Sequence, residues 1–242
     1  MELAGRVALV TGAGRRVGRA IALALAAEKM RVAVHYNSSS REANESVRLA
    51  LASGATDAWA MSADLRDPAA ITKLVDDVAA RGGSLDVLVN SAAEMKRTPF
   101  DSVTPEEWDD IMSLNLRSPF FCSQAAARHM AKGGAIVNIA DLAALETWPE
   151  YIPHGISKAG VMQMTRALAR TLAPAIRVNA VVPGAVLLPE HWTKEDAEKL
   201  IRTTPLARLG APEDVAHAVV YLLESDYVTG DAVVVDGGRH LR

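Results

Sequence analysis

Three ionisable side chains, Asp141, His154 and Lys158, stand at spacings from which acid–base chemistry can be built. His154 and Lys158 are four residues apart in a segment of helical character, so they share one face of that helix. Asp141 follows the apolar run 135–139 and precedes His154 by thirteen residues. A carboxylate favours a charged imidazolium, whereas a nearby ammonium disfavours it. Because histidine titrates near neutrality, these three groups could form a relay that delivers a proton to a substrate.

Two alternatives to this relay stay open. Tyr151 offers a second hydroxyl three residues before His154. Pro153 belongs in a first helical turn, so Tyr151 would precede the helix and periodicity does not aim its ring. The other alternative is that catalysis has been lost and His154 is only a polar residue. General acid–base groups contribute about 10²–10⁴-fold, and cofactor binding can outlast their loss.

A glycine turn near the start of the chain predicts a phosphate-binding site. The apolar run Val7–Val10 is typical of a buried strand, and residues 19–28 are helix-forming. A strand, a glycine turn and a helix N-terminus in this order gather backbone N–H groups and the positive end of a helix dipole around a pyrophosphate. Gly12 permits the tight turn, and Gly18 lets the helix pack close to the sheet. The residues expected at the phosphates are Gly12, Arg15, Arg16, Val17 and Gly18, with Arg16 also able to reach the mouth of a site.

The rest of the chain alternates between strands and helices. Strands are expected at 7–10, 31–36, 56–61, 85–89, 135–139, 176–182 and 232–235, and helices at 19–28, 42–52, 68–80, after Asn115, and at 156–172, 193–202 and 214–223. Such alternation implies right-handed crossovers and a parallel sheet covered on both faces. Residues 1–242 therefore predict a single α/β, doubly wound, Rossmann-type domain with a seven-stranded parallel sheet and helices on both faces.

Composition excludes several classes of function. The net charge of −3 gives no electrostatic case for nucleic acid or an anionic membrane surface. Cys122 is the single cysteine and is expected in the core of a protein from a reducing compartment. No signal segment or membrane-spanning run is evident, so we expect a cytoplasmic protein. No His or Cys has partners at metal-ligand spacing, so no metal site is expected.

The end of the second strand favours a phosphorylated ribose. The sequence there is Tyr36-Asn37-Ser38, and no acid follows until Glu42. A carboxylate at this place would repel a 2′-phosphate, whereas hydroxyls, an amide and nearby arginines suit it. The alternative is a plain polar loop. NADP is therefore expected in preference to NAD.

Other strand ends supply small or polar residues at the same edge of the sheet, where ligands of such folds bind. Asp64 and Leu65 are expected beside the adenine. Asn90, Ser91 and Ala92 let a flat ring lie on the backbone, and Pro183-Gly184 forms another turn of close approach.

The chain resembles the short-chain dehydrogenase/reductase family over its length, from Thr11-Gly12 to Asp236-Gly237-Gly238. The matching pieces are Asp64, Asn90-Ser91-Ala92, Asn115, Lys158, Pro183-Gly184 and Pro212-Glu213-Asp214. Within the family it looks most like the pteridine reductase branch, which carries an arginine at the Arg16 position, a strand end like His35-Tyr36 and an aspartate at Asp141. The resemblance implies that Asn115, Asp141, His154 and Lys158 form the catalytic set, that Lys158 also holds cofactor, and that Arg16, Met95, Asp141 and His154 face substrate.

Two positions depart from the family. His154 stands where the family has its catalytic tyrosine, and Met95 stands where the pteridine branch stacks substrate on an aromatic ring. The resemblance implies an NADPH-dependent oxidoreductase that transfers hydride to a pteridine-like heterocycle or a carbonyl compound. The alternative is an impaired NADP(H)-binding sensor or partner protein.

The resemblance also carries expectations about assembly and a lid. The family pairs its two long helices across subunits, which implies a homotetramer here, with Ala125, Ala126, Ala159 and Gly160 allowing close approach. The segment that begins at His191 and Trp192 is expected to close over the substrate.

Overall fold

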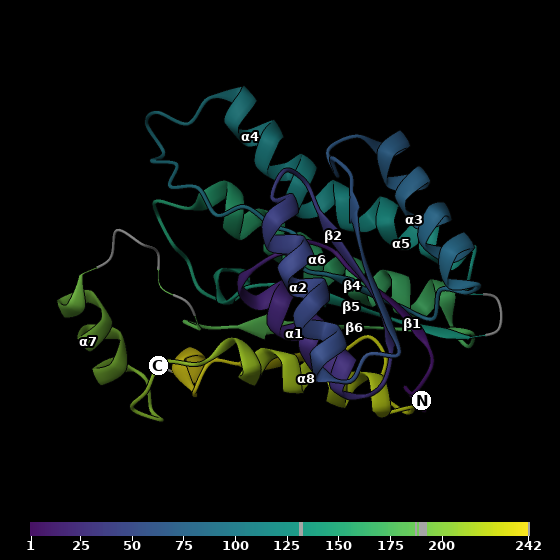
Figure 1. Ribbon diagram of the computed structural model, residues 1–242. Helices are drawn as coiled ribbons and strands as arrows, with labels where there is room; N and C mark the ends of the chain where they lie inside the picture. The colour runs from purple at the N-terminus through teal and green to yellow at the C-terminus, as the bar shows by residue number, and fades with distance from the viewer. Residues whose placement is uncertain (131–132, 187, 189–192, 242) are drawn as a thin grey trace.

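The computed structural model describes residues 1–130, 133–186, 188 and 193–241, and its centre is a parallel sheet (Figure 1). The sheet has seven strands in the order β3-β2-β1-β4-β5-β6-β7. The strands are β1 (Val7–Val10), β2 (Arg31–Tyr36), β3 (Asp57–Ser62), β4 (Val87–Asn90), β5 (Gly134–Ile139), β6 (Ile176–Pro183) and β7 (Ala232–Val235). The strands β1 to β3 extend the sheet in one direction, and after β3 the chain returns to place β4 on the other side of β1. The topological switch point therefore lies between β1 and β4. The fold predicted from the sequence is confirmed.

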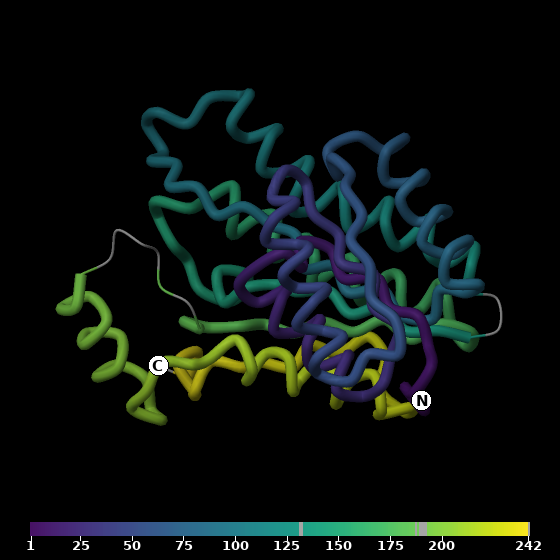
Figure 2. Tube along the Cα trace, in the orientation of Figure 1, coloured from purple at the N-terminus to yellow at the C-terminus, as the bar shows by residue number. Residues whose placement is uncertain are grey.

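Helices cover both faces of this sheet. One face carries α1 (Arg16–Ala27), α2 (Ser40–Ser53) and α8 (Pro212–Glu224), and the other carries α3 (Pro68–Gly82), α5 (Ser118–Ala127) and α6 (Ile152–Leu172). Figure 2 follows the same course along the chain, with α7 (Lys194–Thr203) at the edge of the molecule.

Alternate strand residues build the two hydrophobic layers. In β1, Ala8 and Val10 pack with the α1 and α8 side, and Val7 and Leu9 pack with the α3 and α5 side. All four are buried. Burying one large aliphatic side chain contributes about 1.5–3 kcal/mol, so a strand that is apolar on both faces is held firmly in the middle of the fold. Because β1 also pairs with β4, this burial fixes the carboxyl ends of the two strands relative to each other.

Several helix boundaries differ from the sequence expectation. Helix α1 begins at Arg16 rather than at residue 19, and α6 begins at Ile152 rather than at 156. Pro153 occupies the first turn of α6, where its missing N–H costs nothing.

The helix expected after Asn115 is longer than predicted. It starts upstream as α4 (Pro105–Met112), with a capping box between Thr104 and Glu107. It continues through the π-helical segment η1 (Ser113–Arg117), which contains Asn115, into α5. The sequence analysis missed α4, although Thr104-Pro105-Glu106-Glu107 is a helix-start signal.

The expectation that Ala125 and Ala126 face another subunit is wrong. Both are buried between α5 and the sheet, in the same cluster as Cys122. These three positions share the inward face of α5 because of the 3.6-residue period. The outward face instead carries Phe120, which is 40 % exposed.

Between β6 and α7 the structure describes residues 184–186, 188 and 193. Thr193 caps α7 in a capping box with Asp196, which agrees with the short charged helix expected at 193–202. His191 and Trp192, the expected start of a lid, lie outside the described residues.

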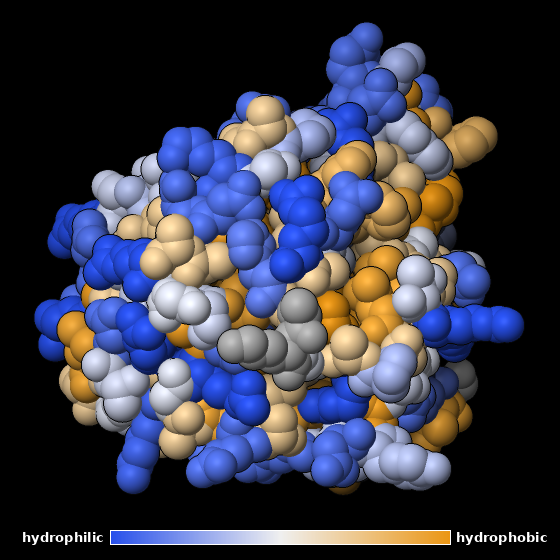
Figure 3. All heavy atoms as spheres, turned by 90° about the vertical axis from the view of Figure 1, so that its right-hand side faces the viewer, coloured by the Kyte–Doolittle hydropathy of each residue, from blue (hydrophilic) through white to orange (hydrophobic). Residues whose placement is uncertain are grey.

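Among the helices of the described chain, none has the length and apolarity needed to cross a membrane. The face in Figure 3 intersperses hydrophilic with hydrophobic side chains.

Candidate active site

The glycine turn and the end of β4 meet at the switch point, and Thr11 joins them. Its Oγ1 accepts the N–H groups of Ser91 at 2.9 Å and Ala92 at 3.0 Å. The same hydroxyl donates to Val89 O at 3.4 Å. One buried hydroxyl therefore fixes the segment after β4 against the turn after β1, as expected for two sides of one ligand cleft.

Gly12 and Gly18 leave room that no side chain could share. Gly12 has a positive φ of 66°, and a β-carbon there would lie 2.9 Å from Ala92 Cα. A β-carbon on Gly18 would lie 2.4 Å from Gly12 O. Both contacts are with backbone, which cannot move aside. The roles predicted for these two glycines agree with this geometry: one allows the turn and the other lets α1 approach it.

The side chain of His35 supports the glycine turn by a hydrogen bond. Gly12 N–H donates to its Nδ1 at 3.1 Å, and its Nε2 lies 3.1 Å from Ala63 O. This pair of contacts makes Nδ1 the acceptor and Nε2 the donor of a neutral ring. Burial lowers the pKa of His35 to about 4, although the Ala63 hydrogen bond and Asp64 oppose this shift. The sequence analysis mentioned His35 only as part of a strand end and missed this structural role.

The residues expected around a dinucleotide lie along one edge. Asn37 and Ser38 are exposed after β2, and Tyr36 is half-buried. Arg15 and Arg16 are exposed at the start of α1, and no acidic residue occupies the first turn of that helix. An uncapped helix N-terminus with arginines beside it is a site for an anion.

Arg16 is one of the described non-glycine residues with positive φ, at 54°. Backbone strain of this kind is common at ligand sites. Asp64 is exposed and its Oδ1 accepts from Arg66 N–H at 2.9 Å, while Leu65 is buried. Asn90 is buried, and its Nδ2 donates to Asn138 Oδ1 at 2.9 Å.

The four residues expected to be catalytic come together at the carboxyl ends of β4 and β5. His154 is buried, with Nε2 lying 3.8 Å from Asp141 Oδ2. Its Nδ1 lies 3.3 Å from Asn115 Nδ2 and 3.2 Å from Glu94 O. Glu94 was not selected from the sequence, because a main-chain carbonyl carries no signal in a sequence.

Lys158 lies one turn further along α6 and is buried. Its Nζ donates to Ile139 O at 2.9 Å. Burial lowers the pKa of Lys158 to about 8, and the charge of Asp141 opposes this shift. Asp141 itself caps the short helix η2 (Leu142–Ala144), where its Oδ1 accepts from Ala143 N–H at 2.8 Å. Its other oxygen is left facing His154.

A cavity of about 350 Å³ opens beside these residues. Its walls are mostly apolar and come from the segment after β4, the loop before α6, the turn after β6 and the last residues of the chain. The lining residues are Met95, Asp141, Leu142, Thr147, Trp148, Pro149, Glu150, Tyr151, Gly184, Ala185, Leu188, Leu200 and Arg239. A cavity of this size and polarity suits a small organic ligand. Asp141 lines this cavity, and the buried Nε2 of His154 lies 3.8 Å from its Oδ2.

Tyr151 and Trp148 also belong to this cavity. Their rings pack edge to face, with centroids 6.2 Å apart. Trp148 Nε1 donates to Glu146 Oε2 at 3.0 Å. Trp148 was not among the site residues expected from the sequence, and it lines the cavity. Tyr151 precedes α6 as its N-cap, as expected, and its ring nevertheless reaches the site.

Gly184 and Pro183 close the far side. A β-carbon on Gly184 would lie 2.6 Å from Asp236 Cβ, so this turn also depends on glycine. Arg239 lines the cavity, and its Nε lies 3.8 Å from Glu146 Oε1. No cluster of three metal-ligating side chains occurs among the residues that the structure describes.

Comparisons with known proteins agree on the kind of protein that has this architecture. A family model described as enoyl-(acyl carrier protein) reductase matches residues 12–240. A relative named ketoacyl reductase 2 of the granaticin polyketide synthase, from Streptomyces violaceoruber, is 40 % identical over 97 % of this chain and 96 % of its own. The 3-oxoacyl-[acyl-carrier-protein] reductase FabG of Staphylococcus aureus is 36 % identical over 97 % of this chain and 98 % of its own. The crystal structure of the angucycline C-6 ketoreductase LanV with bound NADP superposes with a TM-score of 0.93 at 32 % identity, covering 100 % of this chain and 98 % of that one.

Proposed function

Because the chain belongs to the short-chain dehydrogenase/reductase family, we propose that it is an NADPH-dependent oxidoreductase that reduces a carbonyl group of a small apolar compound. The observation that carries this proposal is the Asp141–His154 pair beside a cavity with mostly apolar walls, which Asp141 itself lines. The names of three relatives contain ketoacyl, oxoacyl or ketoreductase activities, which favours a carbonyl as the reacting group.

The cleft fits NADP(H) on features of the chain itself. Gly12 and Gly18 keep side chains out of the space where a pyrophosphate would approach the backbone. Asn37, Ser38 and the arginines at the start of α1 are exposed where a 2′-phosphate would lie, with no carboxylate among them. The other residues proposed to hold the cofactor are Val17, Tyr36, Asp64, Leu65, Asn90, Ser91, Ala92, Lys158, Pro183 and Gly184. When bound, NADPH supplies the hydride.

The chain's own residues then supply the proton. Reduction of a carbonyl adds hydride to carbon and a proton to oxygen. Asp141 lines the cavity and its Oδ2 is near His154 Nε2, so we propose that the proton passes from His154 Nε2 through Asp141 to the substrate oxygen. The present 3.8 Å separation exceeds a hydrogen bond, and such contacts commonly shorten in the substrate complex.

Lys158 and Asn115 hold this relay in place. The Lys158 ammonium is anchored on Ile139 O, one turn further along α6 than His154. With a pKa of about 8, it is mostly charged at neutral pH, and it opposes a second positive charge on His154. Asp141 supplies the countercharge that offsets this repulsion. The relay therefore depends on the carboxylate.

Three finer alternatives remain predictions. A pteridine-like heterocycle is the substrate expected from the resemblance to the pteridine reductase branch, and Met95 and Arg16 would contact it. Tyr151 presents a hydroxyl-bearing ring to the cavity and is a rival proton donor. A protein that binds NADP(H) without turnover has the same cleft but would consume no NADPH.

One experiment separates these possibilities. NADPH oxidation is followed with a panel of aromatic ketones, quinones and dihydropterins, for the wild type, His154→Phe, His154→Tyr and Asp141→Asn. We expect the wild type and His154→Tyr to turn over a ketone, with different pH optima because a phenol titrates far above an imidazole. His154→Phe and Asp141→Asn should lose about 10²-fold or more while NADPH binding persists.

Each contrary outcome has a definite meaning. Normal turnover by His154→Phe would refute the relay and favour Tyr151 or water. A wild type that consumes no NADPH, beside an active His154→Tyr, would establish the non-catalytic alternative. Exclusive use of dihydropterins would replace the ketone by a pteridine.

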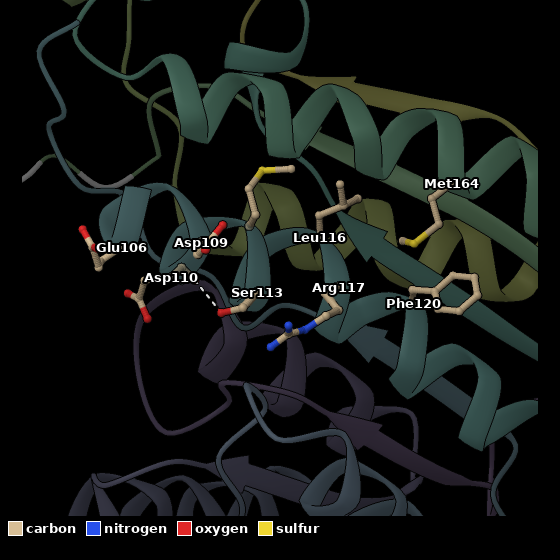
Figure 4. A pocket seen from close by; sticks show the side chains of 9 residues that line it. Glu106, Asp109, Asp110, Ser113, Leu116, Arg117, Phe120 and Met164 are labelled. Carbon is tan, nitrogen blue, oxygen red and sulfur yellow. Dashed lines mark hydrogen bonds between the residues drawn. The ribbon is translucent and has the colours of Figure 1, made fainter. Parts of the chain in front are cut away.

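We also propose that the protein is a homotetramer that pairs its long helices. A groove of about 890 Å³ runs along α4, η1 and α5 and reaches Met164 of α6. In Figure 4, Phe120 and Met164 lie close together at one end of this groove, and the carboxylates of Glu106, Asp109 and Asp110 lie toward the other. An apolar end beside charged groups suits an interface with a polar rim.

A further inference from the structure

The His154 ring has two different neighbours at Nδ1. Glu94 O lies 3.2 Å away and Asn115 Nδ2 lies 3.3 Å away. The first is an acceptor and the second is a donor, so Nδ1 can serve only one of them. Nε2 is buried and has no hydrogen-bond partner among the described residues, with Asp141 Oδ2 at 3.8 Å. The neighbours of Nδ1 therefore decide which nitrogen is left to exchange a proton.

The hydrogens of Asn115 are satisfied without His154. Its Oδ1 accepts Glu94 N–H at 2.9 Å, which fixes the orientation of the amide. One Nδ2 hydrogen goes to Glu94 O at 2.8 Å, and the other has Ser157 Oγ at 3.3 Å. The Ser157 hydroxyl donates its own hydrogen to His154 O at 2.6 Å, so its oxygen can accept from Asn115. Asn115 thus does not need Nδ1 as an acceptor.

Glu94 O already accepts from Asn115, and it also lies close to Nδ1 of His154. If Nδ1 carried a lone pair, two acceptors would face each other at 3.2 Å in a buried site, which is unfavourable. A carbonyl oxygen has two lone pairs, so Glu94 O can accept from both Asn115 and His154. Only a protonated Nδ1 removes this repulsion, because it donates a hydrogen bond to Glu94 O.

We propose that the main-chain carbonyl of Glu94 locks His154 in its Nδ1–H form, that Nε2 alone gains and loses the proton, and that Arg66 positions this carbonyl through its ion pair with Glu94. This inference rests on the proposed function and adds Arg66 as a positioning residue. Arg66 Nη2 lies 2.9 Å from Glu94 Oε2. The same guanidinium holds Asp110 on α4 through Nε at 2.5 Å and Nη2 at 3.0 Å.

The ion pairs of Arg66 with Glu94 and Asp110 fix the positions of the segments that they join. The Arg66 guanidinium lowers the pKa of Asp110, mainly through their hydrogen bond, so this carboxylate is ionised at neutral pH. All three side chains are about a third to a half exposed, and exposed ion pairs contribute little to stability. Their effect is to tie the segment after β4 to the loop before α3 and to α4. This segment carries the carbonyl that faces His154.

The other charged groups around His154 do not lie at Nδ1. Asp141 Oδ2 lies 3.8 Å from Nε2, and the Lys158 ammonium is anchored on Ile139 O. Tyr151 presents its ring to the same cavity, and the Glu94 carboxylate is neutralised by Arg66. Each of these groups acts on Nε2 or on the net charge of the ring, whereas Nδ1 faces the Glu94 carbonyl.

The test follows the two ring nitrogens by NMR in protein labelled with ¹⁵N-histidine, with the His154 signals assigned by their loss in His154→Tyr. We expect Nδ1 to stay protonated through the whole titration and only Nε2 to titrate. Arg66→Met should convert neutral His154 into a mixture of tautomers. Arg48→Met is the matched control, since it breaks a two-point pair with Glu45 on the surface of α2.

This measurement needs no turnover, so its failure is distinct from failure of the proposed function. Neutral His154 with its proton on Nε2 would overturn the lock. An Arg66→Met spectrum identical to that of the wild type would overturn the positioning role. A wild type that consumes no NADPH but shows the Nδ1–H form would overturn the proposed function and leave the lock established.

Kinetics give a second readout. With His154 present, Arg66→Met should lower kcat about tenfold, within the ~10²-fold cost of a 1 Å misplacement, while KM for NADPH changes less than about twofold. In the His154→Tyr background the same substitution should change kcat less than about twofold, because a phenol does not use the Glu94 carbonyl as an imidazole does. Equal losses in both backgrounds would mean that Arg66 only stabilises the fold, and would overturn the positioning role.

Discussion

Acidification should weaken the protein through His35, which supports the glycine turn as a neutral ring. Its Nδ1 accepts from Gly12 N–H and its Nε2 donates to Ala63 O. A second proton on the ring would turn Nδ1 into a donor facing another donor. Protonation of His35 at low pH is therefore incompatible with the hydrogen bond from Gly12 N–H that supports the turn.

The size of the effect follows from the pKa values. Burial lowers the pKa of His35 from 6.5 to about 4, so as the pH falls the unfolded chain binds this proton first. The stability linked to His35 is complete above about pH 6.5 and is lost as the pH falls toward 4. At about 1.4 kcal/mol per pKa unit, acidification from about pH 7 to about pH 5 should reduce the free energy of unfolding by about 2 kcal/mol.

Urea denaturation at the two pH values measures this loss, with His35→Gln as the matched variant. A glutamine side chain can accept from Gly12 N–H through its oxygen and donate to Ala63 O through its nitrogen, and it does not titrate. We expect the pH dependence of the wild type to exceed that of His35→Gln by about 2 kcal/mol. Because other groups titrate equally in both proteins, their contributions cancel in the difference.

A result in which both proteins lose the same stability would refute this explanation, since it would show that His35 is not the titrating group. A wild type more stable at the lower pH would refute the sign. NADPH affinity provides an independent check, because Gly12 belongs to the proposed cofactor cleft and the affinity of the wild type should fall with its stability.

Four further predictions concern the cofactor, the fold of the cleft, the proton donor and the assembly. Fluorescence titration should give tighter binding of NADPH than of NADH, and equal affinities would contradict the 2′-phosphate interpretation of the loop after β2. Gly18→Ala should weaken NADPH binding at least about tenfold with helix content retained by circular dichroism, because its β-carbon would lie 2.4 Å from Gly12 O. Tyr151→Phe should keep most of the wild-type rate of NADPH oxidation, and its inactivation would make Tyr151 the donor. Light scattering at micromolar concentration should give a tetramer, and a monomer would rule out the proposed helix pairing.

The fold was predictable because its signals are local and repeated. Each of the seven strands is a short apolar run, and the pattern of burial on both faces is visible in the letters alone. The glycines at the first turn were interpretable for the same reason, since their roles follow from the strand before and the helix after. Helix α4 was missed although Thr104 and Glu107 form a helix-start signal. The helix is short and only weakly apolar, so its hydrophobic periodicity is hard to recognise.

Residues whose role depends on tertiary burial were harder to assign. Ala125 and Ala126 look like interface residues in a list of small side chains, and only packing against the sheet reveals that they are internal. Trp148 was not among the expected site residues, yet it lines the cavity. In both cases the local sequence was easy to interpret. Whether each side chain is buried or lines a cavity depends on elements that are far away in the sequence.

The catalytic proposal shows where sequence reasoning stops for a physical reason. Spacing predicted that Asp141, His154 and Lys158 share a site, because helix periodicity and the end of β5 fix their positions. Which nitrogen of His154 exchanges the proton depends on the carbonyl of Glu94, and every residue carries a carbonyl. The identity of residue 94 is relevant only because its carboxylate meets Arg66, a contact between two loops. In the proposed mechanism, the proton exchanges at Nε2 because the Glu94 carbonyl holds the proton on Nδ1, and this is the property that the Arg66→Met variant probes.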